Sequence, residues 1–254
     1  MHSCVRLLGL DFADASTEAA AALIAERSSD APFAYVVTPN ADHLVRMHRE
    51  RDLQTLYENA VLRLLDSRVV AELAHTFGLS TPSVAPGSDL TALLLERHVV
   101  PTDRITIIGL GTQWLPPLLR RYGITACAHY DPPRGFERHP ETLTATAEFV
   151  LAHPARYIFL AVGSPRQEIL ANAIRRTGRA TGTGLCIGAS LEFLAGAHRR
   201  APHWMRRIGL EWLYRLGSDP VHMARRYLLD DPAIIPLLLR ERLGLRYQWL
   251  SVND

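Results

Sequence analysis

The chain has 254 residues, of which 48% are hydrophobic and 21% are charged, so it can bury a sizeable core as an ordinary globular protein. All 28 basic residues are arginine, and the net charge at pH 7 is +2. The lack of lysine excludes Schiff-base chemistry, a pyridoxal phosphate anchor and a P-loop, because each of these needs a lysine amine. Any bound phosphate must therefore be held by arginine side chains, helix N-termini or a metal ion.

The sequence also restricts the compartment. No apolar run approaches the ~18 residues that a membrane span needs, and Asp11 falls where a signal peptide would stay apolar. We therefore expect a cytoplasmic protein. The three cysteines, Cys4, Cys127 and Cys186, lie far apart in apolar surroundings, which indicates reduced core thiols rather than disulfides or zinc ligands.

Short apolar runs alternate with amphipathic stretches along the chain. The runs predict strands at residues 5–10, 33–37, 61–65, 105–110, 124–129, 158–162 and 184–188. The amphipathic stretches predict helices at 17–27, 41–59, 68–77, 89–98, 112–122, 141–152 and 165–177. This alternation predicts a doubly wound α/β core over residues 1–195, with a mostly parallel, Rossmann-like sheet flanked by helices. Near Ala195 the strand signals stop, and residues 196–254 are predicted to form a helical C-terminal appendage.

Polar side chains follow the second and third predicted strands, at the carboxyl ends where an open parallel sheet binds its ligands. Thr38 and Asn40 come after the strand at 33–37, and Asp66 comes after the strand at 61–65. A carboxylate in that position could act as a general base, so Asp66 is the leading catalytic candidate. The alternative for Asn40 and Asp66 is structural, because both residue types commonly cap the helix that follows them.

The strand at 105–110 ends in a glycine pair, Gly109-Leu110-Gly111. A dinucleotide fingerprint would have its third glycine where Trp114 stands, so a nicotinamide-dependent reductase is disfavoured. The sequence also lacks the Asp-x-Asp pair that would hold a divalent metal under a diphosphate. A metal-free diphosphate site fits better.

The strand at 158–162 stops abruptly at a polar turn. The turn reads Gly163-Ser164-Pro165-Arg166-Gln167-Glu168. Ser164 is predicted as the N-cap of the following helix, with Pro165 in its first position. The free N–H groups of that helix would favour an anion, and the three residues that follow Pro165 would help to orient it. The alternative is a well-capped helix whose first turn is solvated.

The C-terminal stretch has a composition of its own. From His198 to Asp254 there are ten arginines and six acidic residues, together with three tryptophans and three tyrosines. Basic and aromatic residues at helical spacing, followed by the apolar segment at 233–245, favour contact with an anionic membrane surface. The alternative is a pair of helices packed on the core. Nucleic acid is not expected as a partner, because the rest of the chain has no basic stripe.

Several segments occur in an order and spacing typical of a known family. They are TPNADH at 38–43, Asp66 after a strand, GSDL at 87–90, GSPRQE at 163–168, LAG at 194–196, RAPHWMRRIGLEWLYRL at 200–216 and ARRYL at 224–228. Together they resemble the WecG/TagA/CpsF family of bacterial glycosyltransferases, glycosyltransferase family 26, over nearly the whole chain. The last two segments are the most specific.

This resemblance implies a metal-independent, inverting transfer of a sugar from a UDP-sugar to an undecaprenyl-diphosphate-linked saccharide. The sugar would be of the N-acetylmannosamine type or a related hexose or uronic acid. The reaction would serve cell-envelope or exopolysaccharide biosynthesis, with the protein peripheral on the inner face of the cell membrane. No cofactor would be needed, and self-association into a homo-oligomer stays open.

The resemblance also implies roles for residues. Asp66 would be the base, and Thr38 and Asn40 would line the same catalytic pocket. Substrate contacts are expected from Gly109, Gly163, Ser164, Pro165, Gln167, Glu168, Arg215, Arg225 and Arg226. Of these, Gln167 would belong to the donor site, and the C-terminal arginines would close over the diphosphate.

The chain departs from the family pattern at three places. Ser67 replaces a usual glycine, Val84 a usual arginine, and Leu191-Glu192 a usual Phe-Asp pair. We hypothesise that Arg68 supplies the charge that is missing at position 84. Because of these departures, a non-catalytic protein that binds a UDP-sugar or a lipid-linked diphosphate is the alternative function.

Overall fold

A parallel sheet forms the centre of the molecule. The computed structural model describes residues 3–197, 201–202, 204–205 and 209–245, without the side chains of Arg215 and His222. Within these residues the sheet has six strands in the order β4-β3-β8-β7-β5-β6, and all neighbours are parallel. The bounds are β3 Ala34–Val37, β4 Leu62–Arg63, β5 Arg104–Gly109, β6 Ala126–Tyr130, β7 Tyr157–Ala161 and β8 Thr183–Cys186. The predicted parallel sheet is confirmed.

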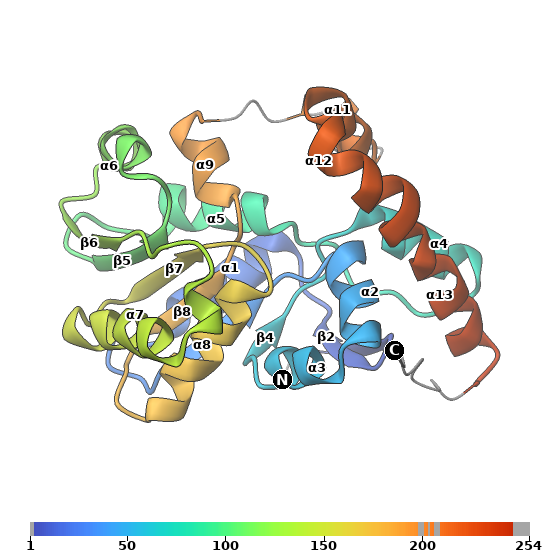
Figure 1. Ribbon diagram of the computed structural model, residues 1–254, viewed down its shortest axis with the longest axis horizontal. Helices are drawn as coiled ribbons and strands as arrows, with labels where there is room; N and C mark the ends of the chain where they lie inside the picture. Colours follow the sequence, from blue (N-terminus) through green and yellow to red (C-terminus); the bar gives the residue numbers. More distant parts are fainter. Residues whose placement is uncertain (1–2, 198–200, 203, 206–208, 246–254) are drawn as a thin grey trace.

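Helices cover both faces of this sheet (Figure 1). In β7, Tyr157 and Phe159 enter one apolar cluster while Ile158 and Leu160 enter the other, as the period of two along a strand requires. The first cluster is covered by α1 (Thr17–Glu26), α5 (Gly87–Arg97), α6 (Leu115–Tyr122) and α9 (Ser190–Ala195). The second is covered by α2 (Ala41–Arg49), α3 (Arg51–Glu58), α4 (Arg68–Thr76), α7 (Pro140–Ala152) and α8 (Arg166–Thr177). Short 3-10 segments, η1 (Thr112–Trp114) and η2 (Phe136–Arg138), precede α6 and α7. The doubly wound, Rossmann-like fold is thus confirmed.

The prediction of one continuous strand at residues 5–10 is wrong. The segment forms an antiparallel hairpin apart from the main sheet, with β1 at Cys4–Leu7 and β2 at Leu10–Ala13. Leu8 and Gly9 turn the chain with φ values of 49° and 81°. Both residues adopt positive φ, as the turn of a two-residue hairpin commonly requires, and this reverses the chain inside the apolar run.

The single helix predicted at residues 41–59 is also wrong. The chain is extended at Glu50, which separates α2 from α3. In one continuous helix, Leu53 would lie two and a half turns from Leu44 and so on the opposite face. The break allows both side chains to be buried.

The appendage is helical where the structure describes it. Its elements are α11 (Glu211–Ser218), α12 (Pro220–Arg225), the π-helical turn η3 (Arg226–Asp230), the 3-10 turn η4 (Asp231–Ala233) and α13 (Ile234–Arg242). Helix α13 packs against α2 and α4, and its Ile234 and Leu238 join the second apolar cluster of the core. The carboxylate of Glu241 accepts a hydrogen bond from the backbone N–H of Leu8 at 2.8 Å. The domain boundary near residue 195 stays a prediction.

Two further expectations concern membranes and thiols. Across the described residues, no helix combines the length and the apolar character needed to span a membrane. All three cysteines are free thiols; Cys186 is buried and Cys127 half-buried, but Cys4 is exposed. The prediction of core thiols is therefore wrong for Cys4, which stands at the exposed start of β1, whereas Leu7 at the end of that strand is buried.

Candidate functional site

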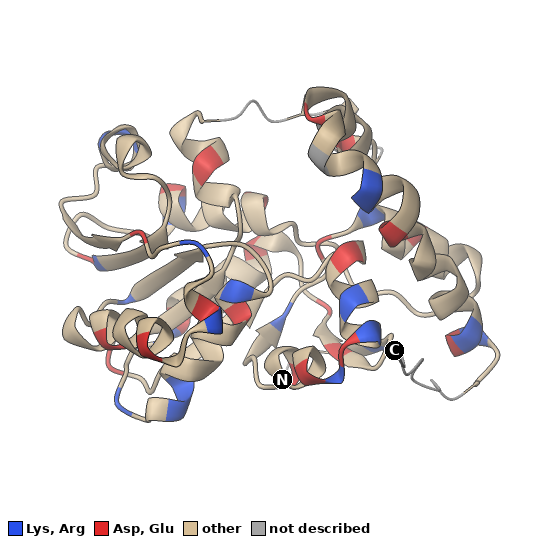
Figure 2. Ribbon diagram, in the orientation of Figure 1, with Lys and Arg blue, Asp and Glu red and all other residues tan. Residues whose placement is uncertain are grey.

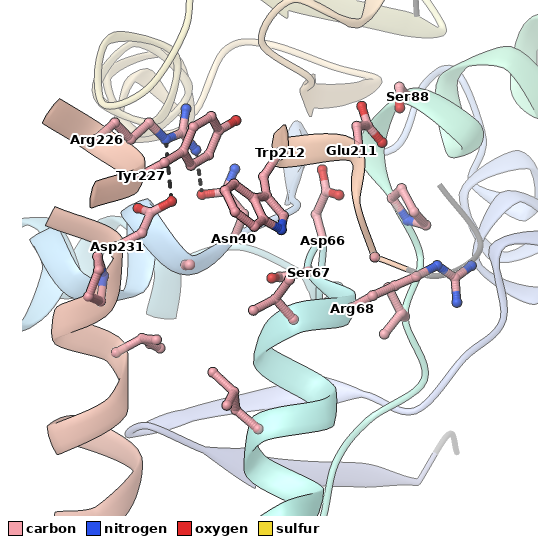
Figure 3. Close-up of a pocket in the computed structure, with 18 of the residues that line it drawn as sticks. Asn40, Asp66, Ser67, Arg68, Ser88, Glu211, Trp212, Arg226, Tyr227 and Asp231 are labelled. Carbon is pink, nitrogen blue, oxygen red and sulfur yellow. Dashed lines mark hydrogen bonds and ion pairs between the residues drawn. The ribbon is translucent and has the colours of Figure 1, made fainter. Parts of the chain in front are cut away.

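A pocket of about 380 Å³ lies beside the carboxyl ends of β3 and β4. One wall comes from the segments that follow these strands, including Asn40 and Asp66, and from the start of α5. The facing wall comes from the appendage, which contributes Trp212, Arg226 and Tyr227 (Figure 3). The fold thus brings three predicted site residues, Asn40, Asp66 and Arg226, into one cavity.

The backbone around Asp66 is held on both sides. Its N–H donates to the carbonyl of Pro39 at 2.9 Å, and the carbonyl of the preceding Leu65 accepts from Ala85 at 2.9 Å. The carboxylate accepts a hydrogen bond at 3.1 Å from the N–H of Gly87, the first residue of α5. Its position is therefore fixed by its neighbours before any ligand binds.

Ser67, and not Asp66, caps the helix α4 that follows them. Its hydroxyl accepts a hydrogen bond from the N–H of Val70 at 3.2 Å and so caps α4. The Asp66 carboxylate does not cap that helix and instead faces the pocket (Figure 3). Asn40 does cap its helix, because its side-chain oxygen accepts from the N–H of His43 at 3.3 Å.

Thr38 lies behind this contact rather than in the pocket. It is 8% exposed, and a Cβ at Gly87 would stand only 2.6 Å from its hydroxyl oxygen. A glycine is therefore required at position 87 for the close approach that lets this N–H reach Asp66. Thr38 is therefore buried beside Gly87, and its catalytic role stays a prediction.

Aromatic and acidic side chains from the appendage face Asp66. In Figure 3 the indole of Trp212 stands between Asn40 and Asp66, and the carboxylate of Glu211 lies on the other side of Asp66. The rings of Trp212 and Tyr227 have centroids 6.0 Å apart and are tilted by 60°. An aromatic face can pack on the C–H face of a sugar ring, and carboxylates accept hydrogen bonds from its hydroxyls.

Arg226 connects the appendage to the start of α2. Its guanidinium donates to the side-chain oxygen of Asn40 at 3.2 Å and lies 3.9 Å from Asp42 and 3.8 Å from Asp231. Acidic and basic positions are interleaved on α2 and the C-terminal helices (Figure 2). Arg226 therefore reaches the pocket from within a network of both charges.

Two titratable groups in this network are perturbed. Burial raises the pKa of Asp231 to about 6, although the positive charge of Arg226 acts in the opposite direction. Burial lowers the pKa of His43 well below its ordinary value, and the charges of Arg46 and Arg226 lower it further. His43 is therefore neutral near pH 7 and adds no charge beside Arg226.

The hypothesis that Arg68 supplies the charge missing at position 84 requires the two residues to lie near each other. Val84 and Arg68 both line the pocket, and Arg68 is exposed at its rim. In Figure 3 the side chain of Arg68 extends away from Asp66. Arg225 does not line the pocket and lies 3.8 Å from Asp230. The side chain of Arg215 falls outside the described part of the chain.

The chain matches the model of the Glycosyl transferase WecG/TagA/CpsF family over residues 5–248. It belongs to this family. Membership confirms the resemblance over nearly the whole chain and makes the protein a glycosyltransferase. Across the described residues of this WecG/TagA/CpsF chain, no group of three or more His, Cys, Asp or Glu side chains is arranged to hold a metal ion.

The GSPRQE turn of this WecG/TagA/CpsF chain differs from the prediction. Helix α8 begins at Arg166 with Pro165 as its N-cap residue and no side-chain cap, so the prediction of Ser164 as N-cap is wrong. The Ser164 hydroxyl instead lies 3.2 Å from the hydroxyl of Tyr57, on α3. The Ser164 hydroxyl therefore contacts a neighbouring helix, and its hydrogen bond to Glu168 partly offsets the rise that burial causes in the pKa of that carboxyl group. Neither Ser164 nor Gly163 lines the pocket.

Gln167 and Glu168 are turned into the protein. They are 2% and 1% exposed, and Gln167 donates to the Glu168 carboxylate at 2.8 Å while accepting from the N–H of Gly188 at 2.8 Å. Burial raises the pKa of Glu168, and the hydrogen bond from Gln167 opposes this. The pair connects the turn after β7 to the turn after β8, and its contact with substrate stays a prediction.

Gly109 has a backbone role in the structure. It has a φ of 88°, and a Cβ there would stand 2.7 Å from the carbonyl oxygen of Ala161 on the neighbouring strand. A side chain would therefore separate β5 from β7. Gly109 does not line the pocket.

Sequence reasoning missed two parts of the site. Trp212 is one of the three C-terminal tryptophans and lies within the segment at 200–216, but the local pattern does not place it opposite Asp66. Asp231 carried no signal beyond its adjacency to Asp230, and only the fold places it beside Arg226. Both come from the appendage, whose position the strand and helix pattern of the core does not predict.

Proposed function

We propose that this glycosyltransferase moves a sugar from a UDP-sugar to an undecaprenyl-diphosphate-linked saccharide, with inversion and without a metal ion or cofactor. The observation that carries the proposal is the placement of Asp66. Its carboxylate is oriented by the N–H of Gly87 and faces a pocket that also presents Trp212. A base and an aromatic surface for a sugar are thereby combined at the ligand-binding edge of the sheet.

In the proposed step, an acceptor hydroxyl oxygen attacks the anomeric carbon of the donor sugar. The new C–O bond forms as the bond from that carbon to the β-phosphate oxygen breaks, and UDP leaves with the electron pair. Asp66 takes the proton of the attacking hydroxyl. One displacement of this kind inverts the configuration at the anomeric carbon.

The leaving diphosphate needs positive charge, which in this chain only arginine, helix N-termini or histidine could supply without a metal. Arg226 and Arg68 line the pocket and are the candidates. Their guanidinium groups would stabilise the charge that develops on UDP. We also retain the donor contacts expected from the GSPRQE turn as part of the proposal.

We further propose that the protein works peripherally at the cytoplasmic face of the membrane, where its acceptor would lie. Val221, Leu228 and Leu229 are strongly exposed on the appendage, with the exposed Arg225 close to them in the chain. Such a mixture suits an anionic lipid surface, since the leucines can insert and the arginine can meet phosphates. The wild-type protein should bind to vesicles that contain phosphatidylglycerol, and the double variant Leu228→Ser/Leu229→Ser should stay unbound.

The deciding experiment offers the purified protein a panel of UDP-sugars with a short-chain, lipid-diphosphate-linked N-acetylglucosamine acceptor, and measures UDP release. Release that depends on the acceptor, persists in EDTA and disappears in Asp66→Asn would support the proposal and identify the donor. UDP binding without turnover on any donor would instead support a non-catalytic binding protein.

A further inference from the structure

The pocket at Asp66 has a second, apolar end. Val69 and Leu73 line it from α4, and Ile234 and Ile235 line it from the start of α13. Most of the polar groups of the pocket belong to other elements, namely the start of α5, α11 and the turns η3 and η4. A ligand that filled the whole pocket would therefore need one polar and one apolar part.

The apolar end continues to the protein surface. Val69 and Leu73 are four residues apart on α4, so they share one face of that helix, and Ile235 and Leu239 do the same on α13. Val69, Ile235 and Leu239 are 38%, 40% and 41% exposed. Because α13 packs alongside α4 (Figure 1), these faces form an apolar strip that begins inside the pocket. We refer to Val69, Leu73, Ile234 and Ile235 as the apolar wall.

The wall is anchored at both ends of α13. Ile234 and Leu238 are buried in the core, and Glu241 near the end of the helix accepts the hydrogen bond from Leu8. Exposed branched aliphatic side chains held in this way remain available to a ligand, and they are typical of a surface that binds an apolar partner.

We propose that the apolar wall binds the first isoprene units of the lipid-linked acceptor. This inference rests on the proposed function, in which the acceptor consists of a sugar, a diphosphate and a polyprenyl chain. If the reacting hydroxyl lies at Asp66, the chain must leave the pocket along some surface, and the apolar wall is continuous with the pocket. Arg68 directly precedes Val69 in the chain and also lines the pocket, so the positive charge that is proposed for UDP lies beside the start of the wall.

Two acceptors that differ only in their lipid test this proposal. One carries a farnesyl group and the other a methyl group on the same sugar diphosphate, and both are used below the concentration at which micelles form. The wild-type protein should have a KM about tenfold lower for the farnesyl acceptor, since burying a branched aliphatic group favours binding by roughly this factor.

The variants Ile235→Ser and Val69→Ser should raise the KM for the farnesyl acceptor severalfold more than the KM for the methyl acceptor. Leu243→Ser is the matched control, because Leu243 is 69% exposed just beyond α13 and does not line the pocket. It should change neither KM. An equal rise for both acceptors in the wall variants, or an equal loss of lipid preference in Leu243→Ser, would overturn the proposal.

A binding measurement separates this proposal from the proposed function. Farnesyl diphosphate carries the lipid and the charge but no sugar, and its affinity can be measured by titration calorimetry without any transfer. Binding that is weakened in Ile235→Ser and Val69→Ser, but not in Leu243→Ser, would support the wall even if no donor were turned over. Equal affinity in all four proteins would exclude the wall even if the transferase were active.

Discussion

Two polar turns lie at the carboxyl edge of the same sheet and behave differently. The turn after β4 carries Asp66, whose carboxylate faces a pocket. The turn after β7 carries Gln167 and Glu168, whose side chains are buried and bonded to each other. In the sequence the two turns look alike, since each is a polar segment between an apolar run and a helix.

The difference arises from what the neighbouring residues supply. Ser67 caps α4, so Asp66 is not needed there, and the appendage adds an opposite wall to the pocket. At the other turn, Gln167 bonds both Glu168 and the N–H of Gly188, which leaves the amide turned inward. A polar residue at a strand end can therefore line a site or hold its scaffold together, and the contacts of its neighbours decide which.

Replacing Asp66 should give the largest effect. Asp66→Asn keeps an oxygen that can accept from Gly87 but loses the base, so the turnover number should fall about a thousandfold, within the range for general base catalysis. UDP binding and the thermal unfolding temperature should change little. Steady-state UDP release, calorimetry with UDP and thermal unfolding measure the three quantities. A variant with wild-type turnover would show that Asp66 is not the base.

Replacing Glu168 should lower stability rather than turnover. Glu168→Ala leaves the buried Gln167 amide without an acceptor and should lower the free energy of unfolding by about 2–3 kcal/mol. Glu168→Gln keeps an acceptor oxygen and should cost about 1 kcal/mol or less, as measured by urea unfolding. If a fully folded Glu168→Gln lost as much turnover as Asp66→Asn, Glu168 would act in the chemical step and the contrast between the two turns would fail.

The contribution of Asp231, on the appendage side of the pocket, to the free energy of unfolding should depend on pH. The pKa of Asp231 is raised to about 6 in the folded protein, so the folded state binds its proton more tightly than the unfolded state does. This contribution to stability is complete below about pH 4 and is lost as the pH rises through 6, by about 2 kcal/mol. Asp231→Asn should remove that loss, so its stability relative to the wild type should improve from pH 4 to pH 7.5.

Unfolding in urea at several pH values measures this difference. His43 changes stability in the opposite direction, because its lowered pKa makes the folded state lose stability as the pH falls below about 6.5. Since both proteins contain His43, its contribution cancels in the comparison. A stability difference that did not change with pH would show that Asp231 keeps an ordinary pKa.

Removing Arg68 should have the smallest effect. Because its side chain is exposed, Arg68→Ala should weaken UDP binding only about tenfold, near the lower end for a hydrogen bond between charged groups. Arg176→Ala is the control, since Arg176 is exposed in the last turn of α8. Unchanged affinity in Arg68→Ala would contradict the hypothesis that Arg68 replaces the arginine missing at Val84.

The sequence predicts the core well for a physical reason. Buried parallel strands such as β5 and β7 are continuous apolar runs, so their positions follow from local pattern. The position of a site at the carboxyl ends of β3 and β4 then follows from the rule for open parallel sheets.

The failures lie where a tight turn, a break in a helix or a contact between distant residues decides the structure. The positive φ values of Leu8 and Gly9 form a hairpin turn inside an apolar run. The helix predicted at 41–59 is interrupted, which allows both Leu44 and Leu53 to be buried. The hydroxyl of Ser164 lies near the hydroxyl of Tyr57 and does not cap α8.

The local pattern of the sequence predicts only the core side of the candidate site. Asp66 and Asn40 follow strands and are found by rule, whereas Trp212 and Asp231 enter the pocket only because the appendage folds back over the core. Nothing in the local pattern of residues 196–254 states where its helices dock.

The hydrogen bond between Leu8 and Glu241 joins the first described hairpin to the last described helix. During synthesis, the ribosome delivers Asp66 and the complete sheet long before it delivers α13. A nascent or truncated chain that ends near residue 195 would thus carry the candidate base without the opposite side of its pocket. The proposed acceptor surface is completed only after α13 has been made and has reached the hairpin of β1 and β2.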